Sequence, residues 1–102
     1  SSEEMNEIFS ASELDQKARR LSVVQPRVTS ALLRQAPATV VVIFIVDENG
    51  RVQDPKVQRT TNPSFDRSAL SAIKQWKFEP AKVQGRAVSS RLRQSFSFEN
   101  KV

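Results

Sequence analysis

The side chains that could perform covalent or metal chemistry in this chain of 102 residues are few. There is no cysteine and no histidine, which removes thiolate chemistry, the commonest metal ligand and the usual general base at neutral pH. The carboxylates Asp47, Glu48, Asp54 and Asp66 remain, but no third acid stands beside Asp47 and Glu48 to complete a metal or acid–base site. Two glycines cannot form a phosphate-binding loop. We therefore expect no enzyme, no metal and no cofactor.

Basic side chains are the other candidates, and they are unevenly spread. The net charge is +5, of which residues 1–50 carry −2 and residues 51–102 carry +7. Such a surplus indicates an acidic partner, an anionic surface or nucleic acid, or simply a well-solvated surface. Phosphate contacts would come from Lys77, Lys82, Arg86, Arg91 and Arg93. Proteins that bind single-stranded nucleic acid also expose aromatic rings for stacking. Phe96 and Phe98 lie on the face of the final strand that points toward the core, so we do not expect this chain to bind nucleic acid.

Two strands joined by a turn are predicted in the middle of the chain. The run 38–46 is apolar on both faces, which is typical of a central strand. It enters the turn 47–50, where Gly50 can adopt the left-handed conformation of a bulged hairpin. A second strand follows over about 51–60. Because Val52 and Val57 are five residues apart with Pro55 between them, we expect a bulge near Asp54-Pro55 or an edge position.

A helix and a long strand follow. Asn62 is a suitable N-cap and Pro63 a suitable first residue, and apolar residues from Phe65 to Trp76 recur on one helical face. A shorter helix is predicted over 28–35, ahead of Pro37. The final strand alternates over 88–98, with Val88, Leu92, Phe96 and Phe98 pointing inward.

These elements predict an α+β domain. We expect a three-stranded antiparallel sheet of β-β-α-β order with two helices packed on one face. The strand order is second, first, final, which leaves the final strand on an edge able to bind an extended segment of another protein. Residues 26–102 are predicted to form the domain, and residues 1–25 to be flexible or loosely packed. The expected structural core comprises Phe44, Gly50, Phe65, Ile73, Trp76 and Phe78.

Four motifs in this order resemble the C-terminal domain of TonB-family energy transducers, over about two-thirds of the chain. They are Val40-x-Val42-x-Phe44-x-Val46-Asp47-Glu48-Asn49-Gly50-Arg51-Val52, then Asn62-Pro63-Ser64-Phe65-Asp66-Arg67-Ser68-Ala69-Leu70, then Ile73-Lys74-Gln75-Trp76-Lys77-Phe78-Glu79-Pro80-Ala81, and finally Gly85-Arg86-x-Val88. The resemblance implies a periplasmic domain of a Gram-negative bacterium.

In that family, an N-terminal helix anchors the full chain in the inner membrane and associates with an ExbB/ExbD-type motor complex, and a proline-rich spacer follows. The C-terminal domain binds the TonB box of outer-membrane receptors for iron-siderophores, haem or vitamin B12, and the box adds as a strand beside the domain's last strand. Because the present chain begins Ser1-Ser2, we expect it to be an excised fragment of such a protein.

The resemblance implies that partner binding falls on the last strand and on the region before the short helix. At the latter, the family usually has a Tyr-Pro pair where this chain has Val28-Thr29. A structural module that tethers the cell wall or another TonB-like chain, and a homodimer paired through the exposed edge, are the alternatives. The predicted partner-binding residues are Arg27, Val28, Thr29, Val88, Ser89, Ser90, Arg91, Leu92, Arg93, Gln94, Ser95 and Phe96.

Overall fold

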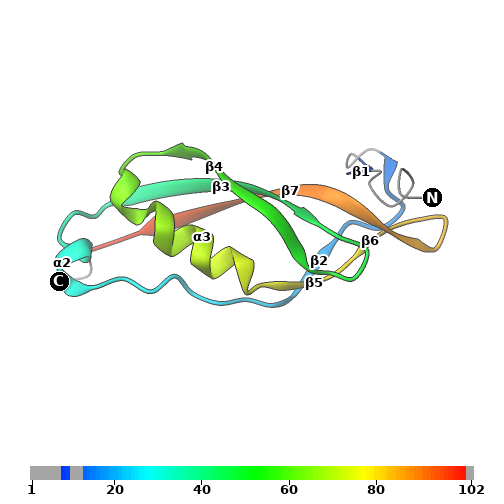
Figure 1. The fold of residues 1–102 in the computed structure, drawn as a ribbon, viewed down its shortest axis with the longest axis horizontal. Coiled ribbons are helices and arrows are strands. Elements are labelled where there is room, and N and C mark those ends of the chain that lie inside the picture. The colour runs from blue at the N-terminus through cyan, green and yellow to red at the C-terminus, as the bar shows by residue number, and fades with distance from the viewer. Residues whose placement is uncertain (1–7, 10–12, 101–102) are drawn as a thin grey trace.

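The computed structural model describes residues 8–9 and 13–100 and confirms the predicted α+β class (Figure 1). The molecule is elongated, with principal extents of 49 × 22 × 21 Å. In chain order, the elements are β1 (Ile8–Phe9), β2 (Arg19–Ser22), α2 (Ser30–Leu33), β3 (Ala38–Val46), β4 (Val52–Thr60), a 3-10 turn (Pro63–Phe65), α3 (Asp66–Lys74), β5 (Lys77–Glu79), β6 (Ala81–Val83) and β7 (Arg86–Phe98).

The main sheet has the order β1-β7-β3-β4, and β6 also pairs with β7. β3 is central, as predicted, and lies antiparallel to both β4 and β7. The expected three strands are therefore present, but the sheet has five, and β2 and β5 form a separate two-stranded sheet. The additional strands are two to four residues long. Segments this short give no periodic sequence pattern, and their partners lie far away along the chain.

The β3–β4 connection matches its sequence signals. The Gly50 N–H donates to the Asp47 carbonyl at 2.9 Å, and Gly50 has a φ of +81°. In the β3–β4 register, Ile43 is opposite Lys56 and Ile45 is opposite Gln53, so β4 contains one extra residue between Gln53 and Lys56. A second extra residue lies between Val57 and Arg59, which are opposite Val42 and Val41. The predicted bulge at Asp54-Pro55 is thus confirmed, and Asp54 has a φ of +54°.

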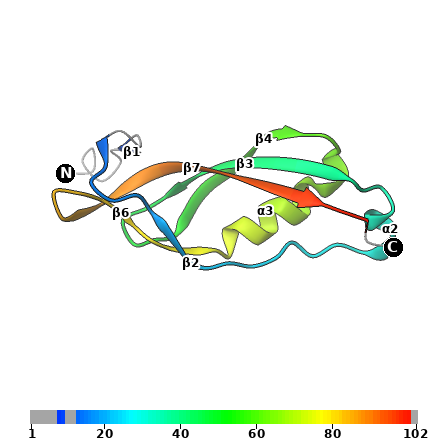
Figure 2. The same cartoon turned by 180° about the vertical axis from the view of Figure 1, so that it is seen from behind.

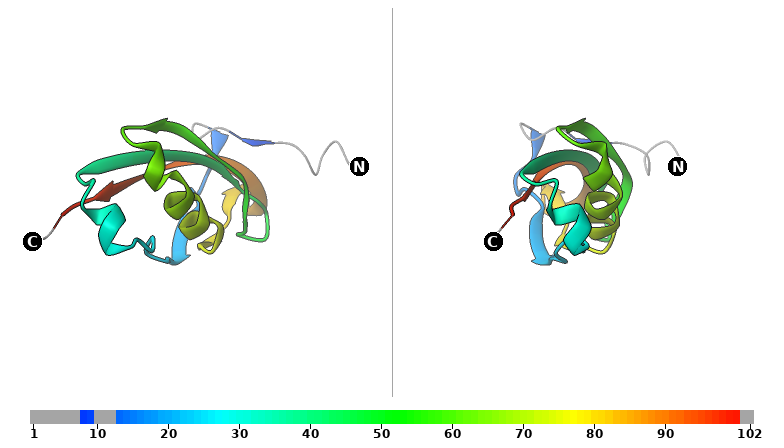
Figure 3. Two further views of the ribbon diagram at one scale, coloured as in Figure 1. Left: turned by 60° about the vertical axis from the view of Figure 1, so that its left-hand side comes forward. Right: turned by 90° about the vertical axis from the view of Figure 1, so that its left-hand side faces the viewer.

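The 3-10 turn that leads directly into α3 begins at the predicted cap. The Asn62 side chain accepts a hydrogen bond from the Ser64 N–H at 3.0 Å, and Pro63 occupies the first helical position. The inward face of α3 is buried against β3 and β4, and the sheet curls around both helices, which lie on its concave side (Figure 3). The buried core on this side includes Phe44, Phe65, Ala69, Ala72, Ile73, Trp76 and Phe78.

Part of the segment that we expect to be flexible or loosely packed, residues 1–25, pairs with the rest of the chain. β2 pairs antiparallel with β5, and the Gln16 backbone exchanges hydrogen bonds with Lys82. The Trp76 indole N–H donates to the Val24 carbonyl at 2.9 Å. These contacts are made across more than fifty residues of sequence, so no local pattern marks them. Residues 1–7 and 10–12 lie outside the described residues.

Candidate functional site

The last strand has an unpaired edge along its second half. β6 pairs with Arg86–Val88, and β1 pairs with Ser89 and Ser90. From Arg91 onward, β3 is the only strand that pairs with β7 among the described residues. The expectation of a free edge from Val88 is therefore wrong at Ser89 and Ser90, because the short strand β1 supplies a partner there. One edge of β7 from Arg91 to Phe98 is therefore not covered by any strand of the described residues.

The direction of the β3 hydrogen bonds shows which β7 residues face that edge. Thr39 and Asp47, at the two ends of β3, bond toward β4 through the Thr61 N–H and the Arg51 carbonyl. Bonding direction alternates along an antiparallel strand, so the even-numbered residues of β3 bond toward β7. Their partners in the unbroken β3–β7 register are also even-numbered. The N–H and C=O groups directed to the free edge therefore belong to Arg91, Arg93, Ser95 and Ser97.

A groove runs beside this edge. It has a volume of about 490 Å³ and lies between the end of β7 and the extended segment that leads from β2 to α2. Figure 2 shows that segment passing below β7 on its way to α2. A strand added to β7 would direct alternate side chains into this space. The lining residues are Arg20, Val23, Gln25, Pro26, Leu33, Trp76, Gln94, Ser95, Phe96, Ser97, Phe98 and Glu99.

Trp76 connects the two walls of the groove. Its indole N–H holds Val24 on one side, and its ring meets the Phe96 ring edge-on at 5.7 Å on the other. The Arg20 guanidinium lies over the same ring, 5.8 Å from its centroid. We assigned Trp76 to the core from sequence, and it is buried. The structure adds that this side chain also positions the groove.

A second hollow of about 460 Å³ continues the first along β7. The two share Arg20 and Gln94, and we call them together the β7 groove. Arg93 lines the second hollow, so the side of this hollow that β7 forms carries a positive charge. The remaining lining residues of the second hollow are Ala18, Arg19, Phe44, Phe78 and Leu92.

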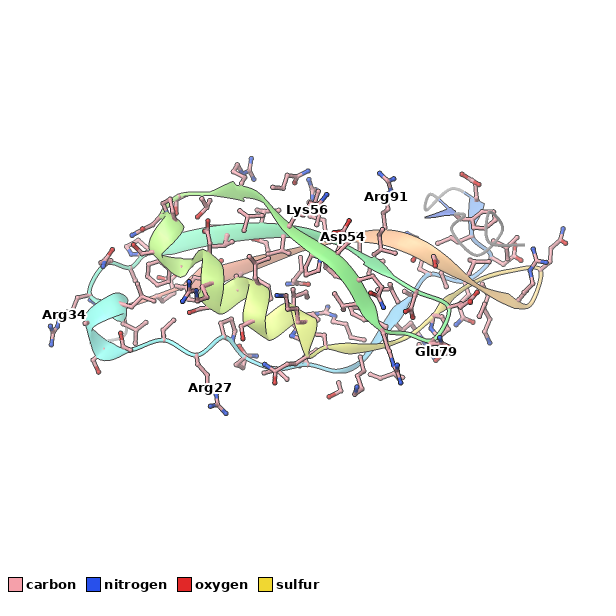
Figure 4. All side chains as sticks on the ribbon, viewed as in Figure 1. Arg27, Arg34, Asp54, Lys56, Glu79 and Arg91 are labelled. Carbon is pink, nitrogen blue, oxygen red and sulfur yellow. The ribbon has the colours of Figure 1, made fainter. Side chains whose placement is uncertain are left out.

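β2, which forms part of the far wall, is attached to β5 by an ion pair. The Arg19 guanidinium donates to the Glu79 carboxylate, and the Gln16 side-chain amide donates to it at 3.0 Å (Figure 4 labels Glu79). The hydrogen bond from Arg19, followed by that from Gln16, lowers the pKa of Glu79 below its ordinary value of 4.5. The carboxylate is therefore held in its charged form at neutral pH.

The predicted residues before α2 lie close to the groove but do not line it. Arg27 is exposed, points away from the body of the domain in Figure 4, and accepts a hydrogen bond from the Ser68 hydroxyl through its carbonyl at 2.8 Å. Val28 packs against the core, and Thr29 caps α2 by accepting from the Leu32 N–H at 3.0 Å. Sequence reasoning missed the residues that do form the wall, from Arg20 to Pro26. The sequence feature that could have predicted this wall is the apolar run from Leu21 to Val24 ahead of Pro26, which favours an extended backbone.

Of the four candidate carboxylates, Asp47 serves the turn, Glu48 and Asp54 are exposed, and Asp66 is half-buried in the first turn of α3. The Asp47 carboxylate accepts from the N–H groups of Asn49 and Arg51 and from the Gln53 amide, each at 2.9 Å. Burial raises its pKa, but these hydrogen bonds together outweigh burial, and the pKa lies below the ordinary 3.8. No group of three acid, histidine or cysteine side chains with metal-binding geometry occurs among the described residues. In the same part of the chain, no helix is long and apolar enough to span a membrane.

Comparisons with known proteins agree with this geometry. Residues 26–99 match the family described as Gram-negative bacterial TonB protein C-terminal. Two curated relatives, both called Protein TonB and both from strains of Xanthomonas campestris pv. campestris, are 35% identical to this chain over 60 residues. That stretch is 58% of this chain and 27% of each relative, so the chain matches about a quarter of their length.

The fold also has a solved counterpart. The solution NMR structure of the Pseudomonas aeruginosa TonB CTD superimposes on this chain with a TM-score of 0.71 and 25% sequence identity. The match covers 95% of this chain and 98% of that one.

Proposed function

The chain belongs to the family of Gram-negative bacterial TonB protein C-terminal domains, and on that premise we propose that it is the receptor-binding domain of a TonB-type energy transducer. In this proposal, an extended box segment of an outer-membrane transporter adds as a strand to the free edge of β7. The observation that carries the proposal is the row of outward backbone groups at Arg91, Arg93, Ser95 and Ser97, to which no strand of the described residues pairs. The domain is an interaction module and not an enzyme.

Strand addition suits this site energetically. Each backbone hydrogen bond to an added strand contributes about 0.5–1.5 kcal/mol net, and such bonds do not depend on the sequence of the ligand. Selectivity then comes from side chains. Those that point inward enter the β7 groove toward Trp76 and Phe96, and those that point outward lie beside Arg91 and Arg93. We expect favoured boxes to contain an apolar residue for the groove and an acid for the arginines.

The setting of the domain follows from the family. We propose that it works in the periplasm and belongs to a longer chain whose N-terminal helix lies in the inner membrane and associates with an ExbB/ExbD-type motor. Force or motion from the motor would pass through the bound box to the transporter, which takes up iron-siderophores, haem or vitamin B12. The Val28-Thr29 pair lies outside the β7 groove, which supports box binding without the family's usual Tyr-Pro pair.

A titration tests this function. Isotope-labelled domain is titrated with synthetic peptides carrying box segments of TonB-dependent transporters, and with a matched peptide in which a central residue is proline. The proposal predicts NMR shift changes along Arg91–Phe98 and around Trp76 with the first peptides and none with the proline control. A folded domain that shows no change at these residues, or equal changes with both peptides, would contradict it.

A further inference from the structure

The face of the main sheet that points away from α3 carries an apolar row. β3 contributes Ile43 and Ile45 to it, and both are half-buried. In the β3–β7 register, Arg93 is opposite Ile43 and Arg91 is opposite Ile45. Residues paired across neighbouring strands share a face of the sheet, so each isoleucine has an arginine beside it.

The opposite side of the apolar row is also cationic. On β4, Lys56 pairs with Ile43, and Arg59 pairs with Val41 one step further along the same face. The acid nearby, Asp54, has its carboxylate 3.6 Å from the Lys56 ammonium and neutralises only part of this charge. The row of isoleucines therefore lies between two cationic rims.

These side chains enclose a shallow trough of about 470 Å³, lined by Ile43, Ile45, Lys56, Arg91 and Arg93 among others. Figure 4 shows Lys56 and Arg91 on the side of the sheet away from α3. Figure 3 shows α2 and α3 on the concave side only, so no helix of the described residues covers this trough. We call it the outer trough.

We propose that the outer trough is a docking surface for an acidic amphipathic helix of another protein. The rims on β4 and β7 are separated by two strand spacings, roughly 10 Å, which is close to the diameter of an α-helix. A helix with an apolar stripe between two rows of Asp or Glu would cover the isoleucines and pair with both rims at once.

Other occupants fit less well. A second copy of this chain presents the same cations, and like charges repel across an interface. A flat anionic lipid surface meets the protruding cationic side chains before it reaches the half-buried isoleucines between them. The outer trough shares Arg91 and Arg93 with the proposed box site, but its isoleucines and its β4 rim lie outside that site. Changes at Ile43, Ile45 and Lys56 therefore report on the outer trough and not on strand addition.

Isoleucine methyl NMR tests the proposal. The probe is a synthetic 18-residue helix with a leucine stripe flanked by glutamates, and its control has lysines in place of the glutamates. The acidic helix should shift the Ile43 and Ile45 methyl signals and leave Ile73, buried on the inward face of α3, unchanged as an internal reference. The lysine helix should shift none of them. Absence of shifts at Ile43 and Ile45 with the acidic helix would overturn the proposal.

Two double variants that change the net charge equally test whether the acidic helix binds specifically at the outer trough. Lys56→Glu with Arg59→Glu should weaken the acidic helix about tenfold, since two attractive charges become repulsive. Arg34→Glu with Arg67→Glu makes the same change in net charge at the C-cap of α2 and on α3, and it should leave binding within about twofold. If the two double variants weakened binding of the acidic helix equally, the attraction would depend only on net charge. Shifts produced by phosphatidylglycerol vesicles and not by the acidic helix would assign the face to a membrane. Either result would overturn the proposal.

Discussion

The side-chain amide of Gln94 donates a hydrogen bond of 2.8 Å to the backbone carbonyl of Ser95. This carbonyl is one of those assigned to the free edge of β7, and its use by a side chain agrees with the assignment, because carbonyls that face β3 are engaged in the sheet. An exposed edge strand invites pairing with other chains. Gln94 satisfies one acceptor of that edge, and an added strand must displace its amide to use the same carbonyl.

Proline at the edge should separate binding from folding. Ser95→Pro removes an N–H that points outward and leaves the bonds to β3 in place, so the domain should stay folded. Box-peptide affinity should fall at least about tenfold, because a donor is lost and the ring obstructs the incoming strand. Isothermal titration calorimetry measures the affinity, and circular dichroism measures the folding.

The control for this change is the neighbouring residue. The Gln94 N–H is assigned to β3, so Gln94→Pro should destabilise the sheet strongly. A Ser95→Pro domain that binds as tightly as the parent, or a Gln94→Pro domain as stable as Ser95→Pro, would contradict the assigned directions.

The two glycines should differ sharply when replaced by alanine. Both have positive φ, +81° at Gly50 and +77° at Gly85, which alone costs an alanine about 1–2 kcal/mol. A Cβ on Gly50 would also lie 1.9 Å from the Phe78 carbonyl oxygen, whereas a Cβ on Gly85 meets nothing within 4 Å. Chemical denaturation should therefore show that Gly50→Ala is the more destabilising by at least about 2 kcal/mol. Equal losses would mean that the approach of β5 to the turn is not rigid.

The indole of Trp76 should matter to the groove beyond its contribution to stability. Trp76→Phe keeps an aromatic ring but loses the hydrogen bond to Val24, at a cost of about 1–2 kcal/mol. Amides of residues 20–25 should exchange faster with solvent, and box-peptide affinity should fall. Ile73→Val, a core change outside the groove that costs about 0.5–1.5 kcal/mol, is the matched control. Equal amide exchange rates of residues 20–25 in the two variants would show that Trp76 does not position this segment.

The Arg19–Glu79 pair predicts a pH dependence. The hydrogen bond from Arg19 lowers the pKa of Glu79 in the folded state, so the folded domain binds fewer protons than the unfolded chain just below pH 4.5. The stability from this carboxylate is fully present above that pH and is lost as the pH falls through the folded pKa.

The Glu79→Gln variant should therefore show a flatter fall in stability on acidification, measured by urea denaturation between pH 3 and 7. The Glu99→Gln variant, which changes an exposed carboxyl beyond the end of β7, should behave like the parent. If Glu79→Gln retained the full acid dependence of the parent, the pair would not contribute to it.

Sequence reasoning succeeded where the signal was local. Val52 and Val57, which cannot share one face of a regular strand, and Pro55 between them predicted the bulge of β4. Asn62-Pro63 predicted the start of the helix over the sheet. The central position of β3 followed from its apolar run. The sequence did not predict pairing between short segments that are far apart in the chain, namely β2 with β5, and β1 with Ser89 and Ser90. The final strand was therefore predicted as a longer free edge than the structure has, and the wall of the groove from Arg20 to Pro26 was missed.

Hydrogen exchange at single-residue resolution tests the central claim most directly. When a box peptide binds, strand addition predicts new protection of the outward amides of Arg91, Arg93, Ser95 and Ser97. The amides of Leu92, Gln94 and Phe96 already bond to β3 and should change little. Protection confined to that alternating set would establish β7 as the receptor-binding edge. Binding with no added protection at those four amides, or with protection only at residues 27–29, would contradict the account.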